Sequence, residues 1–197
     1  MLTKDEVLAP LAARRTTQVV VTTMGAVRPW ARHSSNALDF ASADSGMGHA
    51  ADLALGLALA QPSRQVICLN GDGSMMMSLG TLAIAVEQQA RNFVLFVLQN
   101  ETYELTGNQP VPGAAHVDFA LLARGAGFAS VHSFDDAAAY RERLGDVLAS
   151  PGPTFVVVRT QKGNEPPLGR GPQEAADYLK DSLADAAHRL REALKFG

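Results

Sequence analysis

The chain has 197 residues, of which 47% are hydrophobic and 19% are charged, so its length is typical of one globular domain with a core of its own. The formal net charge is −3 and the Lys and Arg residues are scattered, which argues against binding to nucleic acid or to an anionic membrane surface. No apolar run approaches the ~18 residues of a membrane span and the N-terminus lacks the apolar core of a signal peptide, so we expect a cytoplasmic protein. The single cysteine, Cys68, lies in an apolar run, where we expect it to pack as a small buried side chain in a reducing compartment.

Strand-like and helix-like segments alternate along the chain. Short runs rich in β-branched or aromatic residues and bounded by turn residues predict six strands, at 18–23, 36–41, 65–69, 92–98, 128–133 and 154–160. Segments rich in Ala and Leu predict helices between them, at 49–61, 80–90, 118–127 and 135–150. Because the strands show no polar alternation, we expect both of their faces to be buried. The pattern predicts an α/β fold, with a doubly wound, mostly parallel six-stranded sheet and helices on both faces.

The end of the chain differs from the rest in composition. We assign residues 1–161 to the α/β domain, and 162–172, rich in Pro and Gly, to a linker. Residues 173–197 predict one amphipathic C-terminal helix, whose apolar stripe contains Leu179, Leu183, Ala186, Leu190 and Leu194. The sequence leaves open whether this helix packs on its own domain or reaches a neighbouring subunit.

The stretch VICLNGDGSMMMSLG (66–80) places Asp72 between two glycines, directly after a predicted strand. In an open parallel sheet, ligands bind beyond the carboxyl ends of the strands. Gly71 and Gly73 permit a tight turn and close approach of a ligand, and a helix that starts near Ser74 directs free N–H groups to the same place. Since Asp72 is an anion, a phosphate can lie beside it only with a cation between them, and Mg²⁺ in an oxygen shell suits this role. The stretch therefore predicts a metal-bridged diphosphate.

The next predicted strand supplies further oxygen ligands. It leads into Asn100 and then Thr102, whose backbone carbonyl is a third candidate. Between Gly73 and Asn100 lie 26 residues (74–99), enough for one helix and one strand. Asp72 and Asn100 should therefore follow adjacent strands, and we predict Asp72, Asn100 and Thr102 as the protein's Mg²⁺ ligands.

The GDGS motif at 71–74, followed at this interval by Asn100, resembles the signature of enzymes that bind thiamine diphosphate with Mg²⁺. More narrowly, four segments are similar to the pyrophosphate-binding half of phosphonopyruvate decarboxylases and to the sulfopyruvate decarboxylase beta subunit: GMGHAADLALGLALAQPSRQVICLNGDGSMMMSLGTLAI, TGNQP, VDFALLARGAG and KGNEPPLGR. The similarity runs from about residue 18 to 170. It departs from the family at QNETYELTG (99–107), where Gln99 replaces a second Asn and Tyr103 and Glu104 replace smaller residues.

This resemblance implies a thiamine-diphosphate-binding fold, with thiamine diphosphate and Mg²⁺ as cofactors. It also implies decarboxylation of a small 2-oxo acid of the sulfopyruvate or phosphonopyruvate type, in which the cofactor adds to the substrate and stores electrons as CO₂ leaves. In the family, the Glu that activates the cofactor lies on a separate pyrimidine-binding domain, and this chain is too short to contain both. We therefore expect a companion pyrimidine-domain (alpha) subunit and self-association of this chain. The alternative is a cofactor-binding subunit of a thiamine-dependent carboligase or oxidoreductase complex.

The same resemblance assigns roles to individual residues. Met47 matches the large apolar side chain that lies beneath the cofactor, with ordinary core packing as the alternative, and the Ser45 carbonyl matches an acceptor for the pyrimidine amine. His49, for which a structural role is the favoured alternative, and His116, in a loop, complete the catalytic candidates with Met47. We expect Met75, Met76 and Met77 to pack in the core. The predicted cofactor-binding residues are Thr23, Gly25, Ser45, Gly46, Met47, Gly71, Asp72, Gly73, Ser74, Asn100, Thr102 and Tyr103.

A competing interpretation comes from Gly46-x-Gly48-x-x-Ala51, which follows a predicted strand, precedes a helix and fits the dinucleotide-binding fingerprint. That interpretation needs an acid for the ribose, yet Asp72 lies within its own glycine turn. It also leaves Asn100 unexplained. We therefore favour the thiamine diphosphate interpretation.

Overall fold

Six parallel strands form a single sheet at the centre of the computed structural model, which describes residues 1–44 and 46–195. Their order across the sheet is β2-β1-β3-β4-β8-β7. Each predicted strand is present, with its ends shifted by a few residues: β1 (Val19–Thr23), β2 (Asp39–Ser42), β3 (Val66–Gly71), β4 (Phe93–Gln99), β7 (Ser130–Phe134) and β8 (Thr154–Arg159). Every pairing in this sheet is parallel.

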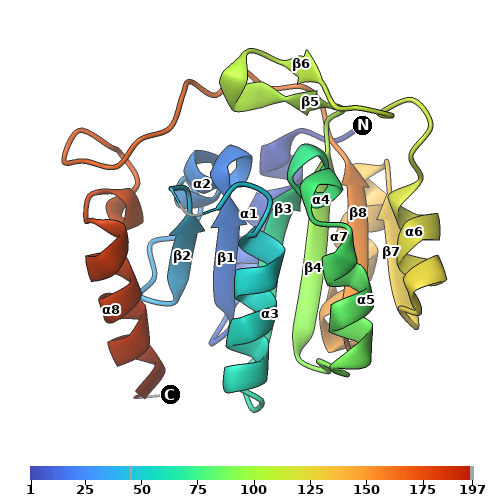
Figure 1. Cartoon of the computed structure of the whole chain (residues 1–197), viewed down its shortest axis with the longest axis horizontal. Helices are drawn as coiled ribbons and strands as arrows, with labels where there is room; N and C mark the ends of the chain where they lie inside the picture. Colours follow the sequence, from blue (N-terminus) through green and yellow to red (C-terminus); the bar gives the residue numbers. More distant parts are fainter. Residues whose placement is uncertain (45, 196–197) are drawn as a thin grey trace.

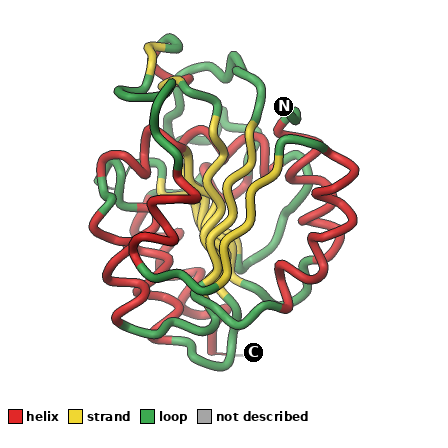
Figure 2. Tube along the Cα trace, turned by 90° about the vertical axis from the view of Figure 1, so that its right-hand side faces the viewer, coloured by secondary structure: helices red, strands yellow, loops and turns green. Residues whose placement is uncertain are grey.

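Helices cover both faces of the sheet, as Figures 1 and 2 show from perpendicular directions. The core on one face is closed by α3 (Ala50–Ala60), α5 (Gly80–Glu87), α6 (Phe119–Ala126) and α8 (Leu183–Lys195). The core on the other face is closed by α1 (Lys4–Arg14), α2 (Met24–Ala31) and α7 (Ala137–Ala149). The predicted doubly wound α/β fold is therefore confirmed.

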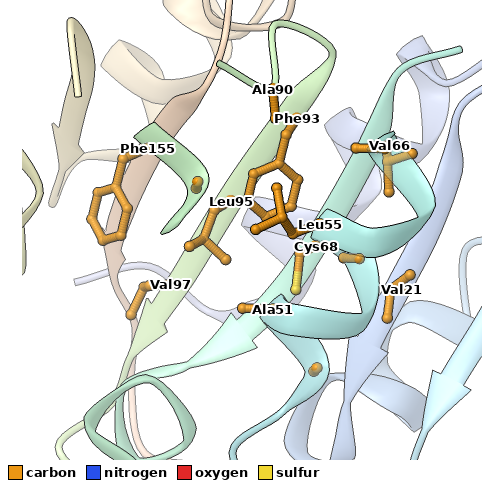
Figure 3. Close-up of a cluster of buried hydrophobic side chains, with 14 of the residues drawn as sticks. Val21, Ala51, Leu55, Val66, Cys68, Ala90, Phe93, Leu95, Val97 and Phe155 are labelled. Atoms are coloured by element: carbon orange, nitrogen blue, oxygen red, sulfur yellow. The ribbon is translucent and has the colours of Figure 1, made fainter. Parts of the chain in front are cut away.

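The strands are apolar because both of their faces are covered. All seven residues of β4 are buried, and each large apolar side chain that leaves water contributes about 1.5–3 kcal/mol to folding. Figure 3 shows Cys68 among Leu55, Phe93 and Leu95 in the first core. Cys68 is fully buried, as predicted, and burial raises the pKa of its thiol. On the other face, the fully buried Trp30 of α2 anchors the second core.

The chain changes direction across the sheet between β1 and β3. From β1 it proceeds to the edge strand β2, then returns to β3 on the other side of β1 and continues to β4. The short helix α4 (Asp72–Met77) follows β3 directly. Above the carboxyl edge lies a small hairpin of β5 (Thr102–Tyr103) and β6 (Gln109–Pro110), with the 3-10 turn η1 (Glu104–Thr106) between its strands (Figure 1). Such a change of direction is where open α/β sheets bind ligands.

The C-terminal helix is shorter than predicted. Residues 173–182 do not continue it; they contain bends and the 3-10 turn η2 (Asp177–Leu179), and α8 begins only at Leu183. Tertiary contacts override helix propensity here: the Tyr178 hydroxyl donates to the Val27 carbonyl at 2.5 Å, and Glu174 pairs with Arg28.

Helix α8 packs on its own domain, since Ala186 and Leu190 belong to the first core, next to β2. The preceding segment, predicted as a linker over 162–172, has no helix or strand and crosses the carboxyl edge of the sheet from β8 towards α8 (Figure 1). The division of the chain at residues 161 and 172 stays a prediction. Within residues 1–44 and 46–195, no helix combines the length and apolar character needed to cross a bilayer.

Candidate functional site

A pocket opens at the carboxyl edge of the sheet, where β1, β2, β3 and β4 end. Its empty volume, including the open mouth, is about 820 Å³. Every predicted cofactor-binding residue that the structure describes lines it: Thr23, Gly25, Gly46, Met47, Gly71, Asp72, Gly73, Ser74, Asn100, Thr102 and Tyr103. The remaining one, Ser45, lies outside the described residues. Segments far apart in sequence thus form one site, and the roles of these residues within it stay predictions.

Asp72 is a buried carboxylate without a cationic partner among the described residues. It is the first residue of α4, and only 3% of its surface is exposed. Its Oδ1 accepts from the Gly73 N–H at 2.9 Å and its Oδ2 from the Glu101 N–H at 2.6 Å. Burial raises the pKa of Asp72 to about 6, against the lowering effect of these two N–H donors. An uncompensated buried carboxylate at the edge of a pocket fits a divalent cation.

Asn100 is bound to its neighbours through both ends of its amide. Its Oδ1 accepts from the Thr102 N–H at 3.0 Å, and its Nδ2 donates to Glu104 Oε2 at 3.1 Å. Glu101, whose N–H binds Asp72, has a φ of 65°, in the left-handed region. The residue after Asn100, Glu101, thus contacts Asp72 directly. Asp72 and Asn100 follow the adjacent strands β3 and β4, as their spacing in the sequence predicts.

Glycines in the pocket leave room for side chains of other segments. A Cβ on Gly73 would lie 2.7 Å from Cδ1 of Tyr103, so the ring lies directly on the glycine backbone. Gly48 has a φ of +86°, and a Cβ there would lie 2.6 Å from Cβ of Met77. The second glycine of the GDG motif is thus needed for contact between α4 and the β5 segment.

Three methionines line the pocket, Met24, Met47 and Met77. Met47 is 65% exposed and lines the pocket, so the core-packing alternative for Met47 is wrong. The prediction that Met75, Met76 and Met77 pack in the core is confirmed for Met75, which is fully buried. Met76 is partly buried and packs against the first core. The prediction is wrong for Met77, which is 49% exposed and lines the pocket. The reason is that α4 lies at the sheet edge, where only part of its surface faces the core.

The two candidate catalytic histidines lie outside the pocket lining. His49 Nδ1 contacts Asp52 Oδ2 at 2.5 Å, and its ring lies next to Gly46 at the pocket rim. His116 is exposed in the loop between β6 and α6. The structure does not bring either ring to Asp72, and their catalytic roles stay predictions.

Lys4 and Glu104 line the pocket but were not predicted as site residues. Lys4 is the first residue of α1; its Nζ donates to the Gly25 carbonyl at 2.9 Å and forms an ion pair with Glu104. Thr3 and Glu6 form a capping box, a sequence signal that predicts the start of α1. The position of α1, and so of Lys4, beside the pocket depends on tertiary packing, which no local sequence pattern indicates.

Comparison with known proteins identifies the family. The model of the family described as "Thiamine pyrophosphate enzyme, C-terminal TPP binding domain" matches residues 21–158. The chain belongs to this family. The resemblance seen in the GDG motif and Asn100 is therefore confirmed, and both lie within the matched residues. In the structure, both line the pocket of this TPP-binding domain at the carboxyl ends of β3 and β4.

Curated relatives of this TPP-binding domain include decarboxylases. Phosphonopyruvate decarboxylase of Streptomyces viridochromogenes is 37% identical over 145 residues, which cover 74% of this chain and 34% of that protein. Sulfopyruvate decarboxylase subunit beta of Methanothermobacter thermautotrophicus is 37% identical over 118 residues, 60% of each chain. The chain thus spans about a third of the first relative and 60% of the second.

A solved structure confirms the fold. The thiamine diphosphate-dependent 4-hydroxybenzoylformate decarboxylase of Rhodococcus jostii RHA1 superposes with a TM-score of 0.69 and 26% identity. The superposition covers 83% of this chain and 33% of that one.

Proposed function

We propose that this TPP-binding domain is the pyrophosphate-binding subunit of a thiamine-diphosphate-dependent 2-oxo acid decarboxylase that acts on sulfopyruvate- or phosphonopyruvate-like substrates. The observation that carries the proposal is Asp72, a buried carboxylate without a cationic partner among the described residues, held next to Asn100 at the ends of β3 and β4. The decarboxylase relatives support the reaction class.

In this proposal, Asp72, Asn100 and the Thr102 carbonyl hold Mg²⁺. Carboxylate, amide and carbonyl oxygens are the ligands that this cation prefers. The diphosphate would bind along the backbone of Gly71 and Gly73, near the hydroxyls of Thr23 and Ser74, which lie 3.4 Å apart.

Thiamine diphosphate, when bound, supplies the carbanion and the electron sink for decarboxylation. The protein contributes orientation and an apolar wall. Met47, Met77 and Leu105 line the pocket and exclude water from the space next to the metal ligands. Met47 is the candidate for the contact beneath the cofactor, because its side chain lines the pocket and is not buried in the core.

The carboxylates of the pocket support a companion subunit. Among the described residues that line the pocket, the only carboxylates are those of Asp72 and Glu104. Asp72 is assigned to the metal, and Glu104 is engaged by Lys4 and Asn100. We therefore propose that the carboxylic acid that activates the pyrimidine ring comes from another domain, which we assign to a pyrimidine-domain subunit. The beta-subunit name of the sulfopyruvate relative supports this assignment.

The metal assignment is tested by calorimetric titration of the full chain with thiamine diphosphate in the presence and absence of Mg²⁺. We expect binding that requires Mg²⁺ and that Asp72→Ala abolishes. The matched control is Asp146→Ala, since Asp146 is exposed, forms a surface ion pair with Arg143 and lies outside the pocket lining. Equal affinity of parent and Asp72→Ala would refute the metal site.

A further inference from the structure

Glu104 joins three segments of the chain at the edge of the pocket. Its side chain is 3% exposed and forms an ion pair with Lys4 of α1. It also accepts from Asn100 Nδ2 at 3.1 Å and from the Glu165 N–H at 3.0 Å. The contact with the segment after β8 is close, because a Cβ on Gly163 would lie 2.8 Å from Cδ of Glu104. A buried carboxylate with this many donors has a fixed orientation.

That orientation determines which atom Asn100 presents to the pocket. An amide has one end that accepts and one that only donates, and only the oxygen binds a cation. With Nδ2 bound to Glu104, Oδ1 accepts from the Thr102 N–H and keeps one lone pair for a metal. A flipped amide would place its oxygen against the Glu104 carboxylate and its NH₂ against the Thr102 N–H. Both of these contacts are repulsive, so Glu104 selects the metal-binding orientation.

Lys4 makes this arrangement compatible with a nearby cation. A free carboxylate at position 104 would compete with Asp72 for a divalent cation, and the Lys4 ammonium neutralises it. Lys4 and Glu165 both lie outside the family match over residues 21–158, whereas Asn100 and Glu104 lie inside it. Residues before and after the matched range thus hold the Glu104 side chain, which lies within it.

We infer that Glu104 is a positioning residue, which holds the Asn100 amide with Oδ1 directed to the metal, and that Lys4 neutralises Glu104 for this purpose. The inference rests on the proposed function, since it assigns Asn100 to Mg²⁺. Outer partners of metal ligands typically change metal affinity about 10- to 100-fold when removed.

The test measures the affinity of the full chain for thiamine diphosphate with Mg²⁺ by calorimetry, and the melting temperature of each variant. The variant Lys4→Met/Glu104→Met replaces the buried ion pair by apolar side chains of similar length, a change that folded proteins often tolerate. We expect its affinity to fall by about 10- to 100-fold. The matched control is Arg28→Met/Glu174→Met, which removes another partly buried ion pair outside the pocket lining and should leave the affinity unchanged.

A second background separates positioning from a general structural role. Asn100→Asp presents an oxygen at both ends of the side chain, so its orientation no longer matters. In the Asn100→Asp background, Lys4→Met/Glu104→Met should not lower the affinity. A loss as large as in the parent background would overturn the inference, because it would mean that Glu104 acts on the pocket in general.

Two further outcomes are decisive. If the parent binds and Lys4→Met/Glu104→Met binds equally well, the inference is wrong while the proposed function stands. If the parent does not bind even together with a pyrimidine-domain subunit, the proposed function falls and takes the inference with it. Should the double variant not fold, ¹⁵N NMR of the parent decides: the Asn100 side-chain amide, assigned by its loss in Asn100→Asp, must show one hydrogen-bonded, slowly exchanging proton. Rapid exchange of both protons would overturn the inference.

Discussion

At the scale of single residues, Asp72 is a buried carboxylate that no cationic side chain in residues 1–44 and 46–195 neutralises. Its pKa is raised from 3.8 to about 6 by burial. A carboxyl group with a raised pKa in the folded state stabilises the fold below its unfolded pKa, and this contribution is lost as the pH rises through the folded value. Above pH 6 the metal-free chain therefore contains a destabilising carboxylate, which a bound cation would relieve.

We predict that Asp72→Asn stabilises the metal-free chain at pH 7.5 by on the order of 1–2 kcal/mol and has little effect at pH 3.5. The gain is limited because Asn offers one acceptor oxygen where Asp72 accepts from both Gly73 and Glu101. Urea denaturation without Mg²⁺ at the two pH values measures the difference. Equal stabilisation at both values would show that ionisation of Asp72 is not its source.

Met47 gives a second prediction at this scale. Because Met47 is exposed, Met47→Ala should leave the free energy of unfolding within about 0.5 kcal/mol of the parent. Affinity for thiamine diphosphate should stay nearly the same, since the diphosphate anchor is elsewhere, while proton exchange at the cofactor C2 slows in the enzyme reconstituted with its companion. The control is Met75→Ala, at a fully buried site, which should cost about 2–5 kcal/mol. Unchanged C2 exchange would remove Met47 from the cofactor site.

At the scale of elements, the loop before α3 meets α4 at Gly48. Gly48→Ala should destabilise the chain by about 1–3 kcal/mol, because the positive φ strains a side chain and the new Cβ meets Met77. The matched control is Gly56→Ala within α3, where a Cβ meets no atom within 4 Å, and a gain of about 0.5–1 kcal/mol is expected. Thermal denaturation measures both. A neutral Gly48→Ala would show that this contact adapts easily.

The elements differ in how far the sequence predicts them. The strands were predicted well because residues 66–69 of β3 and 93–98 of β4 are continuous apolar runs, a pattern that burial on both faces of a strand favours. The start of α8 was not predicted correctly, because tertiary contacts hold the residues before Leu183 in another conformation. Tyr178 binds Val27 and Glu174 binds Arg28, and both partners are far away in sequence.

The candidate site shows the same limit. Asp72 and Asn100 were predicted to lie together because each follows a strand, and the order of strands in a parallel sheet brings such ends to one edge. Lys4 and Glu104 were missed because their ion pair joins residues that are 100 positions apart. Local patterns carry no information about that pairing.

At the scale of the whole molecule, we predict that decarboxylation requires a companion subunit. Sulfopyruvate and phosphonopyruvate are tested with the chain alone and with a candidate pyrimidine-domain subunit added. We expect turnover only for the combination, and none when Asp72→Ala replaces the parent. Sedimentation measures whether the chain alone self-associates, as we also propose. Robust turnover by the chain alone would mean that it supplies its own activating acid.

The buried tryptophan of α2 makes the pocket and the fold accessible to optical measurement. Trp30 is the only tryptophan in the sequence and is fully buried. Its helix begins at Met24, a pocket residue between Thr23 and Gly25, so the indole lies on the same short element as one wall of the site. Intrinsic fluorescence of the unlabelled chain should therefore shift to longer wavelength on unfolding, when the indole enters water. A change in emission on ligand binding, without unfolding, would report movement of that wall.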